Sequence, residues 1–524
     1  MGRAAGILMP VASLPGKYGI GCFGEEAYHF VDFLESAGQT YWQILPLGPL
    51  NHLPLAYDSP YQGFSAFAGN PFFISLDALL KEGVLTEEEI DEADFGNAPA
   101  HIDYEKLAKN RLPLLRKAYE RSRIAEKEEY RRFIRDNAWW LDDYALFMAC
   151  KEFFGGAEWP DWPEDIMRRW RFAIDYYNER LYFDVEFQKY MQFKFFEQWN
   201  ALKSYANRKH IKIIGDIPIY VYFDSADVWA HPELFQLNTE NRQTAVAGCP
   251  PDAFSADGQV WGTPLYRWEK HEQEGFSWWM SRLYMNFQQC DLLRIDHFRG
   301  LDEYFSIPAG ENALAGHWEK GPGMAIFHQM WRTMGRKPVI VEDLGYMTES
   351  VRQMVRDTGF PNMKVLEFAF DPDDLGAAND HLPHNIPTHC VVYPGTHDND
   401  PVNGWFASLD ETRQQQVRTY FGAEDLADSH MHEVFVRAAM MSPAETCVIQ
   451  LQDHLGLASE ARINDPTHQD NNWFWRLSPG MLTESLSRQI FEITRRYGRL
   501  NWEAEGARQM LASKNNKPDD TVEA

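Results

Sequence analysis

The sequence predicts an α/β fold, a (β/α)8 TIM barrel with largely helical insertion subdomains. Eight short apolar runs divide the chain, and helical patterns lie between most of them, for example at 23–37 and 324–334. Several runs are too continuously apolar to have a solvated face, as in parallel strands that are covered on both sides. Eight strands that alternate with helices are the pattern of a parallel barrel.

The apolar runs define the expected strands of the barrel. In chain order they are 6–11, 41–47, 211–219, 292–295, 339–341, 364–368, 390–393 and 447–450. Their uneven spacing indicates insertions within a single catalytic barrel at 1–510. The expected additions are a mainly helical insertion at 72–200, a loop-rich insertion at 220–290, a loop and helical insertion at 371–440, and a disordered polar tail at 514–524. Long loops are usually functional, so the segment 249–262 is a candidate substrate loop.

Composition restricts the class of protein. Hydrophobic residues make up 44% of the chain, which is enough for a large core, and the net charge of −27 disfavours nucleic acid as a partner. No apolar stretch approaches the roughly 18 residues of a membrane span, and Pro10 interrupts an N-terminal run too short for a signal peptide. The six cysteines form no CxxC pair, so we expect a reduced, cytoplasmic protein.

Acidic residues recur at the ends of the predicted strands. Asp216, Asp296, Glu342, Asp398 and Asp453 all lie at or just past such ends. Barrel enzymes form their active sites at the carboxyl ends of the strands, so one barrel mouth is expected to gather these side chains. A pair of carboxyl groups is what cleavage of a glycosidic bond requires, one protonated and one ionised.

Sequence context separates the roles of two of these carboxylates. Arg294 precedes Asp296 by two residues, so both share one face of a strand, and the cation is expected to lower the pKa of Asp296 and favour a nucleophile. Glu342 follows three β-branched residues without an adjacent cation, so burial is expected to raise its pKa, as a general acid requires. The competing interpretation is a structural Arg294–Asp296 pair and a solvated Glu342.

The remaining candidates surround these carboxylates. Asp398 is expected to stabilise positive charge on a sugar ring and His397 to donate to a hydroxyl, although a His-Asp pair at a strand end also often caps a loop. Segment 58–62 contains Tyr61, which either stacks on a sugar or fixes a turn. Segment 250–262 offers the aromatic side chains Phe254 and Trp261, and 462–466 reads as a turn.

Together these segments resemble the 4-α-glucanotransferases (amylomaltase or disproportionating enzyme, glycoside hydrolase family 77) of the α-amylase clan. The resemblance extends from about residue 6 to 500. Further matching motifs are Ser13-Leu14-Pro15-Gly16, Trp42-Gln43-Ile44-Leu45-Pro46-Leu47-Gly48-Pro49, Ser65-Ala66-Phe67-Ala68-Gly69-Asn70-Pro71, Gly215-Asp216-Ile217-Pro218-Ile219-Tyr220-Val221 and Asn472-Trp473-Phe474-Trp475-Arg476.

The resemblance implies a retaining transfer of an α-1,4-glucan segment to the 4-hydroxyl of glucose or another glucan, with no cofactor and no metal. It implies that Asp296 is the nucleophile, Glu342 the acid/base and Asp398 the transition-state stabiliser. The implied substrate-binding residues are Ser59, Tyr61, Asp216, Gln259, Trp261, Arg294, His297, His397 and Asn464.

The chain departs from the family pattern in two places. Residues 51–56 are bulkier than the family's Gly-rich stretch, which together with Tyr104 borders a possible second glucan site; Tyr57 is a candidate replacement for its aromatic residue. After Asn464, relatives often have small residues, whereas this chain has Thr467, His468 and Asn471.

Three other functions stay open. An α-amylase-type hydrolase would use the same barrel, and a catalytically idle glucan-binding protein would keep the acids as structural pairs. A metalloenzyme would use the close pairs His381/His384 or His430/His432, for which the sequence offers no convincing third ligand. We expect maltooligosaccharides as partners, neither nucleic acid nor membrane, and a monomer or homodimer.

Overall fold

The computed structural model describes residues 2–50, 59–251, 257–345, 347–370, 378–468, 471–504 and 508. Several predictions concern residues outside these ranges. They are the departure at 51–56, Tyr57, the aromatic Phe254, the first part of the 371–440 insertion and the tail at 514–524.

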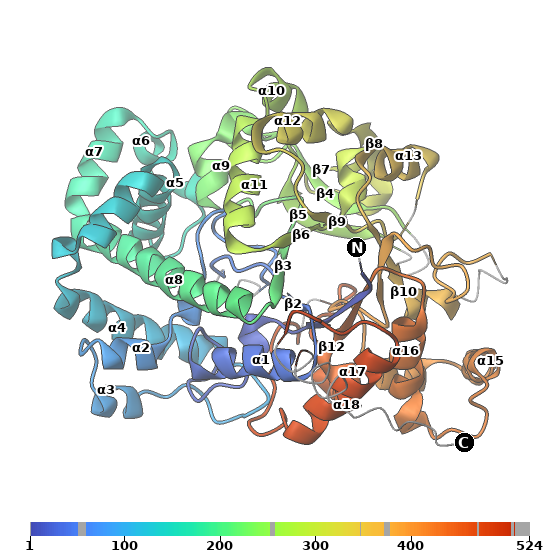
Figure 1. Ribbon diagram of the computed structural model, residues 1–524. Coiled ribbons are helices and arrows are strands. Elements are labelled where there is room, and N and C mark those ends of the chain that lie inside the picture. The colour runs from blue at the N-terminus through green and yellow to red at the C-terminus, as the bar shows by residue number, and fades with distance from the viewer. Residues whose placement is uncertain are drawn as a thin grey trace, which may run out of the picture.

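Eight parallel strands form a closed barrel (Figure 1). They are β1 Ala4–Leu8, β2 Tyr41–Gln43, β3 Lys212–Ile217, β6 Leu292–Ile295, β9 Val339–Val341, β10 Asn362–Val365, β11 Cys390–Tyr393 and β12 Thr446–Gln450. Their order around the barrel is β1-β12-β11-β10-β9-β6-β3-β2. The predicted (β/α)8 fold is therefore confirmed.

Four predicted strands extend past the observed ends. The strand β2 ends at Gln43 instead of 47, and β3 ends at Ile217 instead of 219. In the other two, β1 and β10, the chain leaves the strand for a 3-10 helix. The first strand ends at Leu8, and the chain then forms a 3-10 helix at Val11–Ser13 after Pro10, which has no N–H to donate to a ladder. The sixth strand ends at Val365, because Leu366–Phe370 continues as a 3-10 helix. In both places the apolar run extends beyond the strand into a turn that is also buried.

Amphipathic helices cover the outside of the barrel. They are α1 Glu25–Ser36, α8 Tyr182–Arg208, α11 Ser277–Gln289, α12 Met324–Met334, α13 Glu349–Thr358, α16 Met431–Met441, α17 Leu451–Leu455 and α18 Glu484–Arg496. In α12, for example, Ile326, Phe327 and Met330 are buried on one side. Further helices are α9 Ala226–Ala230, α10 Trp268–Gln273, α14 Val402–Ser408 and α15 Glu411–Phe421. No helix in the described part of the chain combines the length and apolar character needed to cross a bilayer.

The segment between β2 and β3 is helical and lies to one side of the barrel, at the left of Figure 1. It contains α2 Leu76–Lys81, α3 Glu87–Asp91, α4 Tyr104–Ser122, α5 Glu128–Phe153, α6 Glu164–Met167 and α7 Arg171–Arg180 and leads into α8. Thr86 and Glu89 form a capping box at the start of α3. The long helices α5 and α8 pack against each other, and both bury aromatic side chains in the main core.

A second, four-stranded antiparallel sheet lies beside the barrel in the order β5-β4-β7-β8. Its strands are β4 Ala245–Cys249, β5 Gln259–Pro264, β7 Glu303–Pro308 and β8 His317–Lys320. The sequence predicted a loop-rich insertion at 220–290, where β4 and β5 lie, and no strand at the positions of β7 and β8. The sheet was missed because β8 has no apolar run and the β4–β5 pairing contains a register shift between Val246 and Gly248.

One buried arginine near the C-terminus closes the barrel seam between β1 and β12. Arg499 is fully buried, and its guanidinium donates to the carbonyl oxygens of Ala4, Met440, Ser442, Ala444 and Glu445 at 2.9–3.3 Å. Ala4 at the start of β1 also pairs with Thr446 at the start of β12. Arg499, which comes after both strands in the sequence, thus links the start of β1 to the segment before β12.

Candidate active site

Four polar side chains converge because their strands are parallel and adjacent. Asp216 lies within β3, Asp296 and Glu342 directly follow β6 and β9, and Asp398 follows β11 by a short turn. Asp216 is in register with Arg294 of β6, and Arg294 with Ile340 of β9. The carboxyl ends of these strands therefore bring together the residues that the sequence placed at strand ends.

Arg294 is buried between two carboxylates. Its Nη1 lies 2.8 Å from both oxygens of Asp216 and 2.9 Å from Oδ1 of Asp296. The predicted contact with Asp296 is thus present. The prediction for its pKa is wrong: burial raises the pKa of Asp296 to about 8, because loss of hydration outweighs the opposing effect of Arg294, and nearby carboxylates add to the rise.

Glu342 is held next to the nucleophile candidate by main-chain donors. The N–H of His297 donates to Oε2 at 2.8 Å and the N–H of Leu344 donates to Oε1 at 2.6 Å. Burial raises the pKa of Glu342, against the opposing influence of Arg294 and these two donors. The side chain is therefore fixed and only partly exposed, unlike the solvated Glu342 of the competing interpretation.

Asp398 is oriented by two neighbours. Its Oδ1 accepts from Asn464 Nδ2 at 2.6 Å, and its Oδ2 lies 3.4 Å from Nε2 of the buried His397. The loop itself is capped by Asn399, whose Oδ1 accepts from the N–H and hydroxyl of Thr396. Asn399 therefore caps the loop, and the Asp398 carboxylate is oriented by Asn464 and His397.

Tyr61 connects Asp216 to His397. Its hydroxyl donates to Asp216 Oδ2 at 2.7 Å and lies 2.7 Å from His397 Nε2. The Oγ of Ser59 accepts from the N–H of Tyr61 at 3.2 Å, which fixes the turn that carries the ring. Tyr61 is thus placed by a turn and hydrogen-bonded to Asp216 and His397, while its stacking on a sugar ring stays a prediction.

Trp261 and His297 form an aromatic contact next to Glu342. Their ring centroids lie 4.9 Å apart with the planes at 87°, and Trp261 Nε1 donates to Gln259 Oε1 at 2.9 Å. His297 has a left-handed backbone (φ 47°), which places its N–H on Glu342. Burial lowers the pKa of His297 to about 4, so its imidazole is neutral near pH 7.

Sequence reasoning did not assign Trp473 to the site. Its ring centroid lies 5.6 Å from that of Tyr61 and 6.2 Å from that of His397. Its only sequence signal was membership of the motif at 472–476. Its positive φ of 70°, unusual for a bulky residue, marks it as specially placed.

Two predicted features lie elsewhere in the molecule. Asp453 is fully buried, and its Oδ1 accepts from the N–H of Val402 at the first turn of α14, so it acts as a structural cap outside the cluster. Tyr104 is buried, and its hydroxyl donates to the carbonyl of Trp473, so it presents little surface to a second glucan. After Asn464, where the chain departs from the family pattern, the hydroxyl of Thr467 donates to Asp465 Oδ1 at 2.6 Å.

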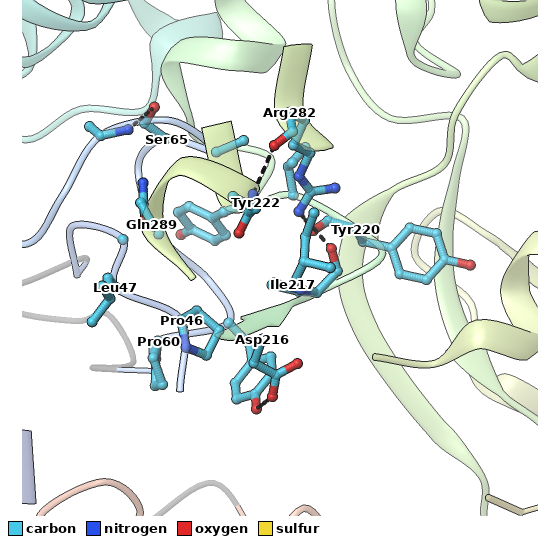
Figure 2. A pocket seen from close by; sticks show the side chains of 18 residues that line it. Pro46, Leu47, Pro60, Ser65, Asp216, Ile217, Tyr220, Tyr222, Arg282 and Gln289 are labelled. Atoms are coloured by element: carbon cyan, nitrogen blue, oxygen red, sulfur yellow. Dashed lines mark hydrogen bonds between the residues drawn. The ribbon is translucent and has the colours of Figure 1, made fainter. Parts of the chain in front are cut away.

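A small cavity of about 50 Å³ lies beside the site (Figure 2). Asp216 lies toward one end of its lining and Arg282 toward the other. Tyr61 also lines it, whereas Asp296, Glu342 and Asp398 do not. It has room for a few water molecules and lies next to Asp216, away from the three carboxylates.

The histidine pairs considered as metal ligands separate into two cases. His381 Nδ1 accepts from the N–H of Val365, and His384 Nδ1 contacts the hydroxyl of Tyr420, so this pair shares no centre. His430 and His432 meet Glu433, with donor atoms within 4.8 Å of one another, a carboxylate that sequence analysis did not consider as a third ligand. None of the carboxylates at the barrel mouth belongs to that group.

Comparisons with known proteins agree on one family. A sequence model of the 4-alpha-glucanotransferases matches residues 9–483. The 4-alpha-glucanotransferase of Clostridium butyricum is 45% identical over 494 residues, covering 94% of this chain and 100% of its own, and that of Thermus thermophilus is 44% identical over 491 residues, covering 92% and 96%. Among solved structures, an amylomaltase from Streptococcus agalactiae in complex with acarbose is 38% identical, with a TM-score of 0.91, and the match covers 95% of this chain and 100% of that one.

Proposed function

The chain belongs to the 4-alpha-glucanotransferase family, glycoside hydrolase family 77, and we propose that Asp296, Glu342 and Asp398 are its catalytic residues. It is an enzyme that transfers segments of α-1,4-glucan. The observation that carries the residue assignment is the pair of contacts made by two consecutive residues. The carboxylate of Asp296 contacts Arg294, and the N–H of His297 donates to Glu342.

In the proposed first step, the carboxylic acid of Glu342 gives its proton to the glycosidic oxygen. A carboxylate oxygen of Asp296 attacks the anomeric carbon, the glycosidic bond breaks, and a covalent glucosyl ester of Asp296 forms. Arg294 opposes the rise in pKa that burial causes at both Asp296 and Glu342, and its contact at 2.9 Å is with Asp296. Burial of the two carboxyl groups keeps a proton on the pair. Such a pair needs its carboxyl groups about 5–5.5 Å apart.

In the second step, the ionised Glu342 removes the proton from the 4-hydroxyl of an acceptor. That oxygen attacks the anomeric carbon, the ester bond to Asp296 breaks, and the new α-1,4 bond keeps the original configuration. Asp398, oriented by Asn464 and His397, supplies negative charge toward the sugar ring as positive charge develops.

The substrate contacts proposed for this site follow the same geometry. Tyr61, Asp216, Arg294 and His397 form one hydrogen-bonded group along one side of the carboxylates. Gln259, Trp261 and His297 form another next to Glu342, and Ser59 and Asn464 position Tyr61 and Asp398. These two groups are suited to bind the sugar units on either side of the scissile bond.

Glucose or another glucan is the proposed acceptor, because the reaction needs only a free 4-hydroxyl. A cytoplasmic location is supported by the cysteines, since Cys22, Cys150, Cys290, Cys390 and Cys447 are buried thiols. For the oligomeric state we propose a monomer or homodimer, which light scattering during size exclusion distinguishes.

Incubation with maltotriose tests transfer against hydrolysis. Transfer yields glucose together with oligosaccharides longer than maltotriose, because one substrate molecule accepts a segment from another. Products that are only shorter than maltotriose would assign the hydrolase alternative. Absence of any product would favour a glucan-binding protein without activity. Asp296→Asn is the control, since the proposed mechanism predicts no products from it.

A further inference from the structure

A second, larger cavity lies outside the catalytic cluster. Its volume is about 230 Å³, and its lining comes from α5, α9, α11 and the segment that contains Ser65. Ser65 is also part of the lining of the small cavity beside Asp216, so one stretch of chain separates the two hollows. None of the residues proposed above to act on substrate lines this second cavity.

Aromatic side chains form one wall of the cavity. Trp139 lines it and is 48% exposed, an unusual state for an indole. Phe67 lies edge-on to Trp139 with ring centroids 4.9 Å apart, and Trp278 packs on Phe67 at 6.0 Å. Since Phe67 and Trp278 are both buried, they restrain the indole of Trp139 while nearly half of its surface stays free for a ligand.

The rest of the lining combines polar side chains with the apolar Ala226, Ala230 and Leu234. It includes the carboxylates of Asp143, Asp227 and Glu274 and the hydroxyl groups of Ser277 and Ser281. Apart from His231, no basic side chain lines the cavity among the described residues. Each of these carboxylates has a partner: Arg169 for Asp143, the N–H of Ala66 for Asp227 and Lys270 for Glu274. The hydroxyl groups of a neutral ligand would therefore be bound by the remaining acceptor positions of the carboxylates and by the two serine hydroxyls.

Aromatic surface together with hydrogen-bond acceptors is the combination that a sugar ring requires, because its C–H face is apolar and its edge carries hydroxyl groups. We propose that this cavity, here named the Trp139 pocket, binds one glucosyl unit of a long α-1,4-glucan outside the catalytic cleft. The proposal rests on the function proposed above and adds a second point of attachment for the same polymer. Attachment at two points raises the local concentration of polymer ends near the carboxylates.

The pocket is expected to matter only for long substrates. A trisaccharide that occupies the cleft on both sides of the scissile bond has no unit left for a second site. Trp139→Ala is therefore expected to raise the KM for amylose by about fivefold to tenfold and to leave kcat/KM for maltotriose unchanged. Trp502→Ala is the matched control, since Trp502 is equally exposed at 48% and lies outside the pocket lining.

A second variant keeps the test independent of one substitution. Ser281→Phe places a large ring in the cavity from α11 and is expected to raise the KM for amylose while Trp139 remains in place. Thermal unfolding of both variants identifies any that do not fold. An unchanged KM for amylose in the folded variants would overturn the proposal, as would an equal loss with maltotriose. Failure of the wild type to transfer from maltotriose would instead overturn the proposed function.

Discussion

A single nitrogen atom of Arg294, Nη1, lies 2.8 Å from both carboxylate oxygens of Asp216. Both side chains are almost completely buried, so each charge depends on the other in place of water. The pair fixes the guanidinium, and the same nitrogen then reaches Asp296 at 2.9 Å. Asp216 therefore positions the cation that opposes the rise in pKa of Asp296, the proposed nucleophile.

Replacement of the nucleophile is the most direct test of these roles. Asp296→Asn keeps the shape of the side chain and its ability to accept from Arg294 but removes the attacking charge. We expect kcat for maltotriose disproportionation to fall by about 10⁴-fold or more. The melting temperature is expected to be unchanged or higher, because the substitution removes a carboxylate whose burial is unfavourable when ionised. Retention of most of the activity would contradict the assignment.

Glu342→Gln separates proton donation from nucleophilic attack. We expect almost no transfer from maltotriose, whose leaving oxygen needs a proton. α-Glucosyl fluoride needs none, so it should still react once with Asp296. Without a base to activate the acceptor, the glucosyl ester is expected to accumulate, and intact-protein mass spectrometry would detect it on Asp296. No ester in this variant would show that Glu342 and Asp296 do not act in this order.

The pH dependence of the wild type follows from the same pair. Burial raises the pKa of Glu342, so the acid keeps its proton above the usual range of a carboxyl group. We expect kcat/KM for maltotriose to fall as pH rises through the raised pKa of Glu342, when the proton is lost. With α-glucosyl fluoride, release of fluoride should not show this alkaline loss. If the loss appeared equally with both substrates, it would belong to another group.

Tyr61→Phe tests the hydroxyl that joins Asp216 to His397. Removing it takes one hydrogen bond from Asp216, which keeps its contact with Arg294, and one from His397, while the ring that packs near Trp473 is kept. We expect kcat/KM to fall about tenfold to a hundredfold, corresponding to about 1.4–2.7 kcal/mol. The control is Tyr205→Phe, which removes a hydroxyl bonded to Asp32 at 2.6 Å on α1. Equal kinetics for the two variants would remove Tyr61 from the site.

Asp453 predicts an effect of pH on stability rather than on catalysis. Burial raises its folded pKa to about 7, above the roughly 3.9 of an unfolded aspartate. Between these values the folded state holds a proton that the unfolded state lacks, so this residue's contribution to stability falls as pH rises. Asp453→Asn cannot ionise and can still accept from Val402. We expect the melting temperature of the variant to gain on that of the wild type between about pH 4 and 7. A constant difference across this range would contradict the raised pKa.

The barrel and its carboxylates could be predicted because both depend on local sequence. A run such as Val339-Ile340-Val341 has no polar side chain to face solvent, so it indicates a strand that is buried on both faces. An acidic residue directly after such a run lies at the end of the strand. Geometry then follows from the fold, since parallel strands bring their carboxyl ends together. This reasoning led to Asp296, Glu342 and Asp398 before any contact was known.

Features that depend on distant partners could not be predicted in this way. Asp453 also follows an apolar strand, but its partner is the backbone of Val402, a contact that only the fold creates. The net pKa of Asp296 depends on how much water its surroundings exclude, which the position of Arg294 alone does not reveal. The strand β8 has no apolar run and forms by pairing with β7.

The position of Arg499 in the sequence determines when the barrel can close during translation. The strand β1 emerges first from the ribosome but has to wait for β12, its partner on one side, and then for the arginine that bonds across their seam. All three carboxylates of the proposed active site are translated well before that seam can close. A nascent chain that ends just before Arg499 would thus contain Asp296, Glu342 and Asp398, the proposed catalytic residues. It would lack the hydrogen bonds of Arg499 that join the start of β1 to the segment before β12.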